Sequence, residues 1–350
     1  MAEKIPVGVL GATGSVGQRF VQLLEGHPWF EVAAVTGSDR TVGSKYGESC
    51  RWILSEPMPD SVRELVVQPS LPVLSGLPLM FSALPSGHAS EIEPEYARAG
   101  AMVCSNASAF RQEGDVPLLL PEVNPEHIAL LHRQRRERGW TGGIATNPNC
   151  TSTGMTVALS ALQRSFGVKK VFAVSMQAVS GAGYPGVPAL DIMDNVIPFI
   201  GGEEEKVAWE PRKMLGQMAG EHVRLHDLVM SMHCNRVSVS DGHTVCLSIA
   251  LEQPAEAEAV LDVLRDYQAP QISRELPSTP RPVIQYYSQE NRPQPRLDRL
   301  YGNGMTTMVG RLRPDEILDW KLVVLSHNTI RGAAGGSIYN AELLHSQGYF

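Results

Sequence analysis

The sequence predicts an α/β protein whose first domain contains a doubly wound parallel sheet and whose second domain contains a mixed sheet. Within the first 36 residues, a buried strand, a glycine turn, a helix and a second apolar strand follow one another, which is the pattern of a βαβ unit. Strand-like and helix-like segments keep alternating up to residue 146, whereas longer strands with few crossovers follow. A length of 350 residues also suits about two domains.

The elements of the first domain follow in order. We expect strands at residues 5–10, 30–35, 64–68, 79–84, 101–104, 116–120 and 144–146, and helices at 18–24, 89–99 and 125–138. Parallel strands that are joined through helices form right-handed crossovers and therefore a doubly wound, Rossmann-type sheet. This domain should cover residues 1–149 and include a C-terminal helix at about 328–350.

The second domain should cover residues 150–327. We expect helices at 152–165 and 254–267, and strands at 168–179, 227–240, 244–251, 306–313 and 322–326. The proline-rich segment 268–295 should be irregular, and the tail 330–345 should be helical. This sequence of elements favours an α+β domain with a mixed or antiparallel sheet.

Composition excludes several classes of protein. The chain has 30 Lys and Arg against 37 Asp and Glu, a net charge of −7, so we expect no nucleic-acid partner. It contains no run of about 18 apolar residues and no signal peptide, so we expect no membrane association. Five cysteines without C-x-x-C spacing predict neither a disulfide framework nor a metal site, and favour reduced thiols in the cytoplasm.

A G-x-x-G-x-x-G turn between the first strand and helix predicts a dinucleotide site. Glycines let the backbone approach a pyrophosphate, and the helix N-terminus supplies amide donors. The expected contacts are Gly11, Thr13, Gly14, Ser15 and Val16. The alternative is a tight turn that serves only helix packing.

The end of the second strand favours NADP over NAD. An NAD enzyme usually has an acidic side chain here for the ribose hydroxyls. This chain instead offers Ser38, Arg40 and Thr41 for a 2′-phosphate, although Asp39 is a competing signal. Arg40 as a solvated loop charge is the alternative interpretation.

Cys150, in NPNCTST, is a candidate nucleophile because it lies just before a predicted helix. The positive end of a helix dipole lowers the pKa of a thiol there and favours the thiolate, which is the reactive form. A buried structural role is the alternative, and it is the one we assign to the other four cysteines. The partner of the thiol would be His243, which follows a glycine turn in RVSVSDGH, although an isolated histidine is as often structural.

The linked motifs GATGSVG, SNASAFR, NPNCTSTGM, SGAGYPG, GGEEEK and RVSVSDGH resemble those of the aspartate-β-semialdehyde dehydrogenases. They occur in the family's order from Gly8 to Ser337, and the segments TGSDRTVGSKY and GGEEEKVAWEPRKML are similar to the archaeal and fungal branch. Ser238 departs from the proline that is frequent in the family, and we expect little consequence.

The resemblance implies roles for individual residues. Cys150 would be acylated, His243 would act as acid and base, and Gln177 would orient the acyl group. Asn149 is implied to lie near the substrate, and Arg111 and Lys206 are implied to bind its phosphate. Arg236 would bind the carboxylate. Glu203 would bind the amino group, with Glu204 and Glu205 as alternatives to Glu203. Those implied to touch the cofactor are Ser82, Ser180, Gly181 and Asn328. Considered alone, each of these residues could have a non-catalytic role instead, as a surface charge, as part of a helix start or in a structural hydrogen bond.

The implied reaction is NADPH-dependent reductive dephosphorylation of L-aspartyl-4-phosphate, an acyl phosphate, to L-aspartate 4-semialdehyde and phosphate. It would proceed through a cysteine thioester, on the pathway to lysine, threonine and methionine. Alternatives are a related reductase of N-acetylglutamyl phosphate or malonyl-CoA, and a non-catalytic NADP-binding sensor. Glu203 argues for a free amino group, and the intact set of motif residues argues for catalysis. The family also implies a homodimer or homotetramer, assembled through the sheet of the second domain.

Overall fold

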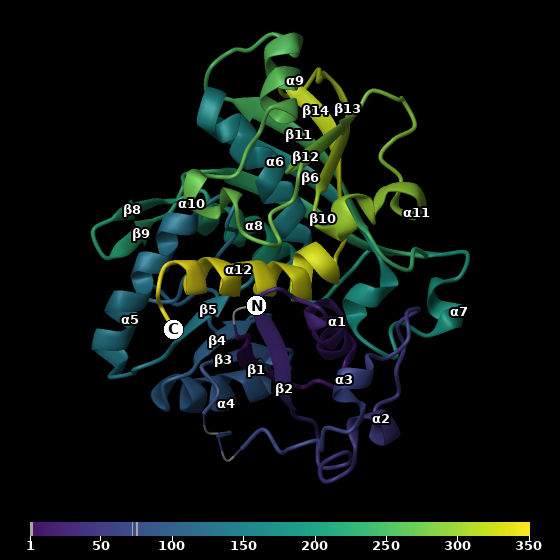
Figure 1. Ribbon diagram of the computed structural model, residues 1–350. Coiled ribbons are helices and arrows are strands. Elements are labelled where there is room, and N and C mark those ends of the chain that lie inside the picture. Colours follow the sequence, from purple (N-terminus) through teal and green to yellow (C-terminus); the bar gives the residue numbers. More distant parts are fainter. Residues whose placement is uncertain (1–2, 72, 75) are drawn as a thin grey trace. The chain divides into compact units, whose positions relative to one another are not determined.

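The computed structural model describes residues 3–71, 73–74 and 76–350 (Figure 1). Residues 1 and 2 lie outside the described residues. They begin the N-terminal segment in which we expect no signal peptide. The chain divides into two compact units. The first comprises residues 1–119, 126–147 and 334–350, and the second comprises residues 120–125 and 148–333.

The first unit contains a five-stranded sheet. Its strands are β1 (Ile5–Leu10), β2 (Phe30–Val35), β3 (Leu79–Ser82), β4 (Met102–Ser105) and β5 (Gly143–Thr146). They lie in the order β2-β1-β3-β4-β5, and every pairing is parallel. The strand order reverses between β1 and β3, so a crevice is expected at the carboxyl ends of these two strands. The predicted Rossmann-type sheet is confirmed.

The helices of the first unit are α1 (Ser15–Leu24), α2 (Tyr46–Ser49), α3 (Asp60–Arg63), α4 (Ser86–Arg98), the 3₁₀ helix Pro125–Ala129, α5 (Leu130–Arg138) and α12 (Gly335–Ser346). α1 buries Phe20, Val21 and Leu24 on one face, the spacing of an amphipathic helix. The C-terminal helix α12 packs against α1, β3 and β4, so the end of the chain returns to the first unit.

Two predicted strands of this unit are wrong. Residues 64–68 form only the isolated bridges of Val66 and Gln68, and residues 116–120 form only the bridge of Leu118. Proline explains both cases, because Pro69 follows the first segment and Pro117 lies inside the second. A proline has no N–H to donate to a neighbouring strand, so neither ladder can extend.

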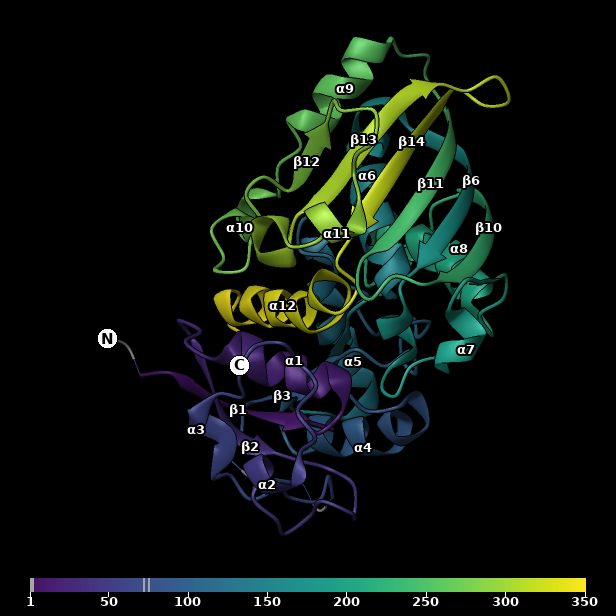
Figure 2. The same ribbon diagram turned by 90° about the vertical axis from the view of Figure 1, so that its right-hand side faces the viewer.

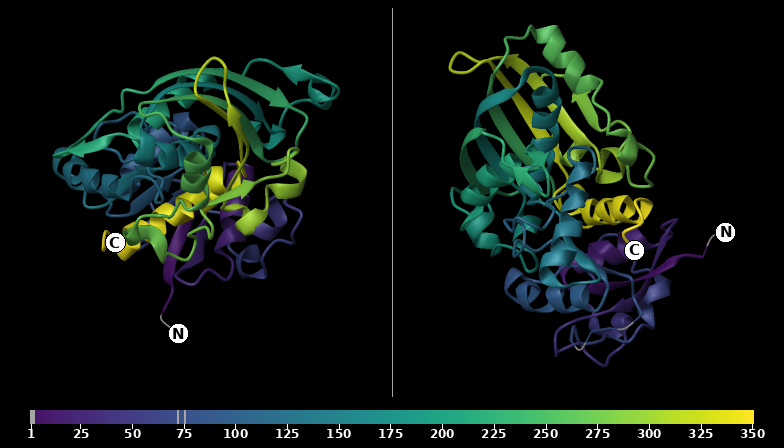
Figure 3. Two further views of the ribbon diagram at one scale, coloured as in Figure 1. Left: turned by 90° about the horizontal axis from the view of Figure 1, so that it is seen from above. Right: turned by 90° about the vertical axis from the view of Figure 1, so that its left-hand side faces the viewer.

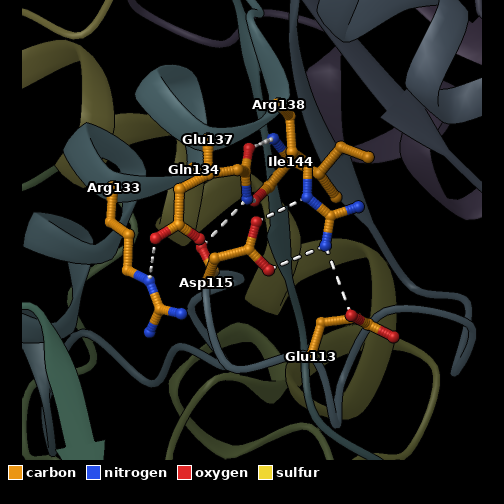
Figure 4. Close-up of polar contacts among 7 residues, drawn as sticks. All are labelled: Glu113, Asp115, Arg133, Gln134, Glu137, Arg138 and Ile144. Carbon is orange, nitrogen blue, oxygen red and sulfur yellow. Dashed lines mark hydrogen bonds and ion pairs between the residues drawn. The ribbon is translucent and has the colours of Figure 1, made fainter.

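Polar side chains of α5 protect the outer edge of this sheet (Figure 4). The Gln134 amide accepts a hydrogen bond from the Ile144 N–H at 2.7 Å and donates to the Ile144 carbonyl at 3.0 Å, which occupies the free edge of β5. Arg138 forms a forked ion pair with Asp115. Burial alone would raise the pKa of Asp115, but hydrogen bonding and the charge of Arg138 outweigh it and lower that pKa. These contacts fix the chain just after Arg111.

The second unit contains a seven-stranded mixed sheet, which confirms the second half of the predicted fold class. Its strands are β6 (Val168–Gln177), β7 (Val196–Ile197), β10 (Val229–Val237), β11 (His243–Leu251), β12 (Ile284–Tyr287), β13 (Thr307–Pro314) and β14 (Trp320–Ser326). They lie in the order β12-β13-β14-β11-β6-β10-β7. Only the pairs β10–β6 and β12–β13 are parallel. A separate hairpin joins β8 (Gln217–Ala219) and β9 (His222–Arg224).

One face of this sheet is covered by helices (Figure 2). The helical elements of the second unit are α6 (Cys150–Phe166), the 3₁₀ turn Val179–Ala182, α7 (Ala189–Ile192), α8 (Glu203–Met214), α9 (Ala257–Arg265), α10 (Gln271–Arg274), α11 (Pro295–Asp298), the 3₁₀ turn Tyr301–Gly304 and the π-turn Ile330–Ala334. The buried helix α6 packs against β14, β11, β13 and β6, and α8 and α9 pack against α6. Figure 2 looks onto the uncovered face, with α6 behind the strands, and the right-hand view of Figure 3 looks from the helix side.

The segment 268–295 is more ordered than its proline content suggested. It contains α10 and β12, and β12 extends the sheet beside β13. The tail is also not one continuous helix, because the π-turn Ile330–Ala334 precedes α12.

Candidate active site

The candidate nucleophile begins helix α6. Cys150 is the first residue of α6, and Asn149 is its N-cap: Asn149 Oδ1 accepts hydrogen bonds from the N–H groups of Thr151 (2.7 Å) and Ser152 (3.4 Å). The thiol is partly exposed, and its Sγ lies 3.1 Å from His243 Nε2. The candidate nucleophile and its candidate partner, 93 positions apart in sequence, therefore lie in contact.

The His243 ring is held in one tautomer. His243 starts β11 and is 1% exposed, and its Nδ1 accepts a hydrogen bond from the Ala178 N–H at 3.0 Å. Burial, together with electrostatic repulsion from Arg236 and His327, lowers the pKa of His243 to about 3. The ring is therefore neutral near pH 7. Since Nδ1 accepts, the one ring proton lies on Nε2 and faces the Cys150 sulfur.

A buried guanidinium lies beside this pair. Arg236 near the end of β10 is 6% exposed and donates from Nη1 to the Ala178 carbonyl at 2.8 Å. Gly181 packs on both groups: a Cβ there would lie 2.8 Å from Arg236 Nη1 and 3.1 Å from His243 Nε2. Gln177, which ends β6, is the register partner of Arg236, and its Nε2 donates to Ser175 Oγ at 3.2 Å.

Two carboxylates of α8 hold Asn149. Glu203 Oε1 accepts from Asn149 Nδ2 at 2.9 Å, and Glu210 Oε2 accepts from the Asn149 N–H at 2.7 Å. Glu203 is 8% exposed, whereas Glu204 and Glu205 are exposed. Of the three adjacent glutamates, Glu203 is therefore the one that contacts the N-cap of α6.

The remaining predicted residues of the second unit surround this centre or lie on α8. Asn328 Nδ2 donates to Ser180 Oγ at 2.8 Å, and Asn328 Oδ1 accepts from the Gly242 N–H at 2.8 Å. Asn328 thus joins the 3₁₀ turn Val179–Ala182 to the turn that precedes His243. Lys206 is half-buried on α8, three residues after Glu203.

The first unit contains a separate cavity of about 540 Å³ at the point where the strand order reverses. Its lining residues come from the loops after β1, β2 and β3 and from α4, and are Gly11, Thr13, Gly14, Gly37, Ser38, Asp39, Pro69, Ser70, Leu71, Ala83, Leu84, Pro85, His88 and Ile92. The N-terminus of α1 has no side-chain cap, so its amides remain for an anion.

Glycines are required in the turn after β1. Gly11 has φ of +71°, a conformation that L side chains rarely adopt, and a Cβ at Gly17 would lie 2.2 Å from the Gly11 carbonyl oxygen. Ser15 and Val16 start α1, and Ser82 ends β3 fully buried.

The turn after β2 presents a cation to solvent. Arg40 is exposed, and Thr41 Oγ1 donates to the Ser38 carbonyl at 3.0 Å. Ser38 and Asp39 line the cavity, whereas Arg40 and Thr41 lie next to it in the same turn.

Arg111 lies in the loop after β4. It is 8% exposed, and its Nη2 donates to the Asn106 carbonyl at 2.8 Å. The loop is anchored at two further points: the Asn106 N–H donates to the Ser82 carbonyl at 3.1 Å, and the Ser108 N–H donates to Ser86 Oγ at 3.1 Å.

Comparison with known proteins identifies the family. A model of the semialdehyde dehydrogenase NAD-binding domain matches residues 6–131, and a model of the semialdehyde dehydrogenase dimerisation domain matches residues 159–331. The aspartate-semialdehyde dehydrogenase of Archaeoglobus fulgidus is 49% identical over 341 residues, with 97% of each chain covered. The chain belongs to the aspartate-semialdehyde dehydrogenase family.

Relatives from fungi and a solved structure agree. The aspartate-semialdehyde dehydrogenase of Saccharomyces cerevisiae is 42% identical, covering 98% of both chains. The crystal structure of the Candida albicans family member with NADP has a TM-score of 0.91 and 40% identity, and covers 99% of this chain and all of that one. Archaeal and fungal members of the family are thus both similar to this chain over nearly its whole length.

The described residues contain neither a helix suited to crossing a bilayer nor a candidate metal cluster. In residues 3–71, 73–74 and 76–350, no helix is long and apolar enough to cross a bilayer. The same part of the chain contains no group of three or more His, Cys, Asp or Glu side chains that could hold a metal ion.

Several residues of these sites escaped prediction. Glu210 lies seven residues after Glu203, two helical turns along α8 on the same face, so the helical period was an available signal. The Ala83–Pro85 segment lies at the carboxyl end of β3, where the position of the strand-order reversal would have pointed to it. The Ala178 N–H and Ser70 had no such signal, because their roles depend on backbone placement.

Proposed function

We propose that this member of the family catalyses NADPH-dependent reductive dephosphorylation of L-aspartyl-4-phosphate to L-aspartate 4-semialdehyde and phosphate. This reaction belongs to the pathway to lysine, threonine and methionine. The observation that carries the proposal is the Cys150–His243 pair at the N-terminus of α6, with Sγ and Nε2 separated by 3.1 Å. The second unit performs the chemistry, and the first unit binds the nucleotide.

Covalent catalysis begins at Cys150. The thiolate attacks the acyl carbon, the carbon–oxygen bond to phosphate breaks, and a thioester remains. Three features favour the anionic sulfur: the positive end of α6, the cation Arg236 and the Nε2–H of His243. The thiol proton leaves to solvent, because a ring already protonated on Nε2 cannot accept it there.

In this proposal His243 therefore acts as a hydrogen-bond donor to the sulfur, in place of the acid and base role that the resemblance implies. Its Nε2–H is available to the thiolate and to an oxyanion that forms next to the sulfur. Collapse of a tetrahedral oxyanion regenerates a carbonyl and either expels phosphate or releases the thiolate, so the ring need not lose its proton. The Ala178 N–H keeps this tautomer throughout.

The cavity of the first unit suits a dinucleotide. A glycine turn that a Cβ would obstruct and an uncapped helix N-terminus fit a pyrophosphate, and Ser38, Arg40 and Thr41 fit a 2′-phosphate. When bound, NADPH supplies the hydride that reduces the thioester. We also assign Ser82, Ser180, Gly181 and Asn328 to cofactor binding.

Opposite charges suggest which residues bind each charged group of the substrate. Glu203, buried next to Asn149, would receive the α-ammonium group, and the Arg236 fork would receive the α-carboxylate. Arg111 and Lys206 would bind the phosphate, and Gln177 would orient the acyl group. A carboxylate at position 203 favours a substrate with a free amino group over an N-acetylated one or a thioester of coenzyme A.

The experiment is an assay in the reverse direction. Wild-type protein should reduce NADP with L-aspartate semialdehyde only when phosphate is present. Cys150→Ala should lose this activity by about 10³-fold or more while unfolding at the same denaturant concentration. Cys246, which we expected to be buried like the other structural cysteines, is exposed on β11, so Cys246→Ala is the matched control and should retain full activity. Activity in Cys150→Ala close to that of wild type would refute the proposal.

We further propose a homodimer or homotetramer in the cytoplasm. The sheet face opposite α6 exposes Phe172 (42%) and Val229 (61%), which is unusual for a surface that remains free. Five free cysteines support a reducing compartment.

A further inference from the structure

The second unit contains a buried ion pair that the proposed reaction does not use. One of its two residues is the sequence neighbour of a residue that contacts Cys150. Arg331 and Glu122 have side-chain exposures of 0% and 1%, and Arg331 Nε donates to Glu122 Oε1 at 3.0 Å, with Nη2 also contacting that oxygen. Burying two charges requires desolvation, so such a pair is weak evidence for stability and calls for another reason.

Glu122 is itself held firmly. It lies in residues 120–125, a short segment that belongs to the second unit although both flanking segments belong to the first. Tyr267 Oη donates to the Glu122 carbonyl at 2.7 Å, and Arg164 Nη2 donates to the same oxygen at 3.2 Å. Ser273 Oγ donates to the preceding carbonyl, that of Pro121, at 2.5 Å. The main chain at Glu122, which carries the carboxylate that pairs with Arg331, is therefore fixed.

The residue after Arg331 contacts the nucleophile. A Cβ at Gly332 would lie 2.6 Å from Cys150 Cβ and 2.8 Å from Cys150 Cα, distances that real Cβ atoms essentially never have. These are a backbone atom and the atom bonded to it, so a rotamer change cannot relieve the overlap. The Gly332 backbone is thus packed against the Cα and Cβ atoms of Cys150.

The element that carries both residues is a π-turn. Residues Ile330–Ala334 form it, and the Gly332 N–H donates to the His327 carbonyl at 3.0 Å. Such turns are rare and occur frequently at functional sites. Because it lacks the regular α-helical ladder, its position depends on side-chain anchors, and Arg331 is the buried charged one.

We propose that Glu122, Arg331 and Gly332 are positioning residues for the nucleophile. The Glu122–Arg331 pair fixes the π-turn Ile330–Ala334, and Gly332 then sets where the Cys150 side chain stands relative to His243 Nε2. The inference rests on the proposed role of Cys150. Reactions that depend on near-attack geometry are sensitive to small displacements: about 1 Å can reduce a rate 100-fold.

The first test is Gly332→Ala, with Gly310→Ala as the matched control. A Cβ at Gly310 in β13 would lie 2.5 Å from the Arg292 carbonyl oxygen, an overlap of similar size in the same unit but on another element. Both variants should lose stability. Per folded molecule, Gly332→Ala should lower kcat by about 10- to 100-fold with the KM for NADP unchanged, whereas Gly310→Ala should keep the kcat of wild type.

The second readout needs no substrate. Iodoacetamide should alkylate Cys150 more slowly in Gly332→Ala than in wild type at pH 7, and the pH midpoint of that reaction should rise, because the sulfur moves away from Nε2–H. Gly310→Ala should leave the midpoint unchanged. Peptide mass spectrometry distinguishes Cys150 from the other four cysteines.

The anchor is tested with Glu122→Gln, which keeps the side-chain shape and an acceptor oxygen but removes the charge. We expect kcat and the alkylation midpoint to change in the same direction as in Gly332→Ala, at a lower melting temperature. Wild-type kcat and alkylation in Gly332→Ala would overturn the role of Gly332, and wild-type values in folded Glu122→Gln would overturn the role of the ion pair. Both outcomes are distinct from failure of the proposed function, which Cys150→Ala reports.

Discussion

At the residue scale, the contacts of the two ring nitrogens of His243 determine its tautomer and its charge. The Ala178 N–H at Nδ1 and the Cys150 sulfur at Nε2 occupy both ring nitrogens. A protonated ring would place an N–H against the Ala178 N–H, so burial and this donor both oppose the imidazolium form. The ring is therefore a fixed donor toward the sulfur, and the same arrangement links this residue to the pH dependence of folding.

Protonation of His243 should weaken the fold in mild acid. Its pKa is about 3 when folded and near 6.5 when unfolded, so between these values the unfolded chain binds one more proton. Stability should rise with pH across this window, by up to about 1.4 kcal/mol per pH unit from this residue. Urea unfolding from pH 4 to pH 7 would measure it, and His243→Gln should have a shallower slope. Equal slopes would contradict the buried neutral ring.

Glu203 should determine affinity for the substrate amino group. Glu203→Gln keeps an acceptor for Asn149 Nδ2 but loses the charge, so the KM for L-aspartate semialdehyde should rise about 10-fold or more. The KM values for phosphate and NADP should not change. Glu205→Gln, which alters an exposed neighbour, is the control in the same steady-state assay. An unchanged semialdehyde KM in Glu203→Gln would assign the ammonium group elsewhere.

At the scale of elements, the structure uses the ends of strands and helices for chemistry. β1, β2 and β3 end around the cavity of the first unit, α6 begins with Cys150, and β11 begins with His243. Element ends carry unpaired backbone groups and lead into loops, so they can present side chains and amides that a continuous ladder would consume.

The turn after β2 should set the choice between NADP and NAD. Arg40→Ala removes the exposed cation of this turn, so the KM for NADP should rise about 10-fold while the KM for NAD stays the same. Lys45→Ala is a suitable control, because Lys45 is a nearby exposed cation whose partner is Glu64. If the two variants change the NADP KM equally, the effect is one of general charge and Arg40 has no specific contact.

At the scale of the whole molecule, the sheet of the second unit has one face that a partner would cover. Phe172, Val174 and Cys246 lie side by side on it, on β6 and β11, as the register requires. His233 and Ser231 extend the same face on β10 and are exposed. The exposed apolar side chains Phe172 and Val229 on this face favour its burial against a partner.

Charge on this face should break the oligomer. Phe172→Glu places a carboxylate at the centre of the face, so light scattering should report a smaller mass than for wild type at the same concentration. Ile317→Glu is the control, since Ile317 is 89% exposed in the turn between β13 and β14 and should not alter the mass. If the protein assembles through another surface, Phe172→Glu should have the same mass as wild type.

The local signals of the sequence were sufficient for part of this molecule. The turn after β1 needs Gly11 at positive φ and Gly17 without a Cβ, and the N-cap of α6 needs a side chain such as Asn149. These requirements involve residues within a few positions of each other, so composition and spacing reveal them. The alternation of strands and helices likewise indicated the first sheet, and the longer strands with few crossovers indicated the second.

The tertiary structure decided everything that depends on residues distant in sequence. It paired Cys150 with His243, chose Glu203 over its two neighbours and added β12 to the sheet. It also brought Glu122 to Arg331, 209 positions away, and packed Gly332 against Cys150. No local pattern encodes these contacts, because their free energy depends on the packing and burial of both partners, which only the completed fold establishes.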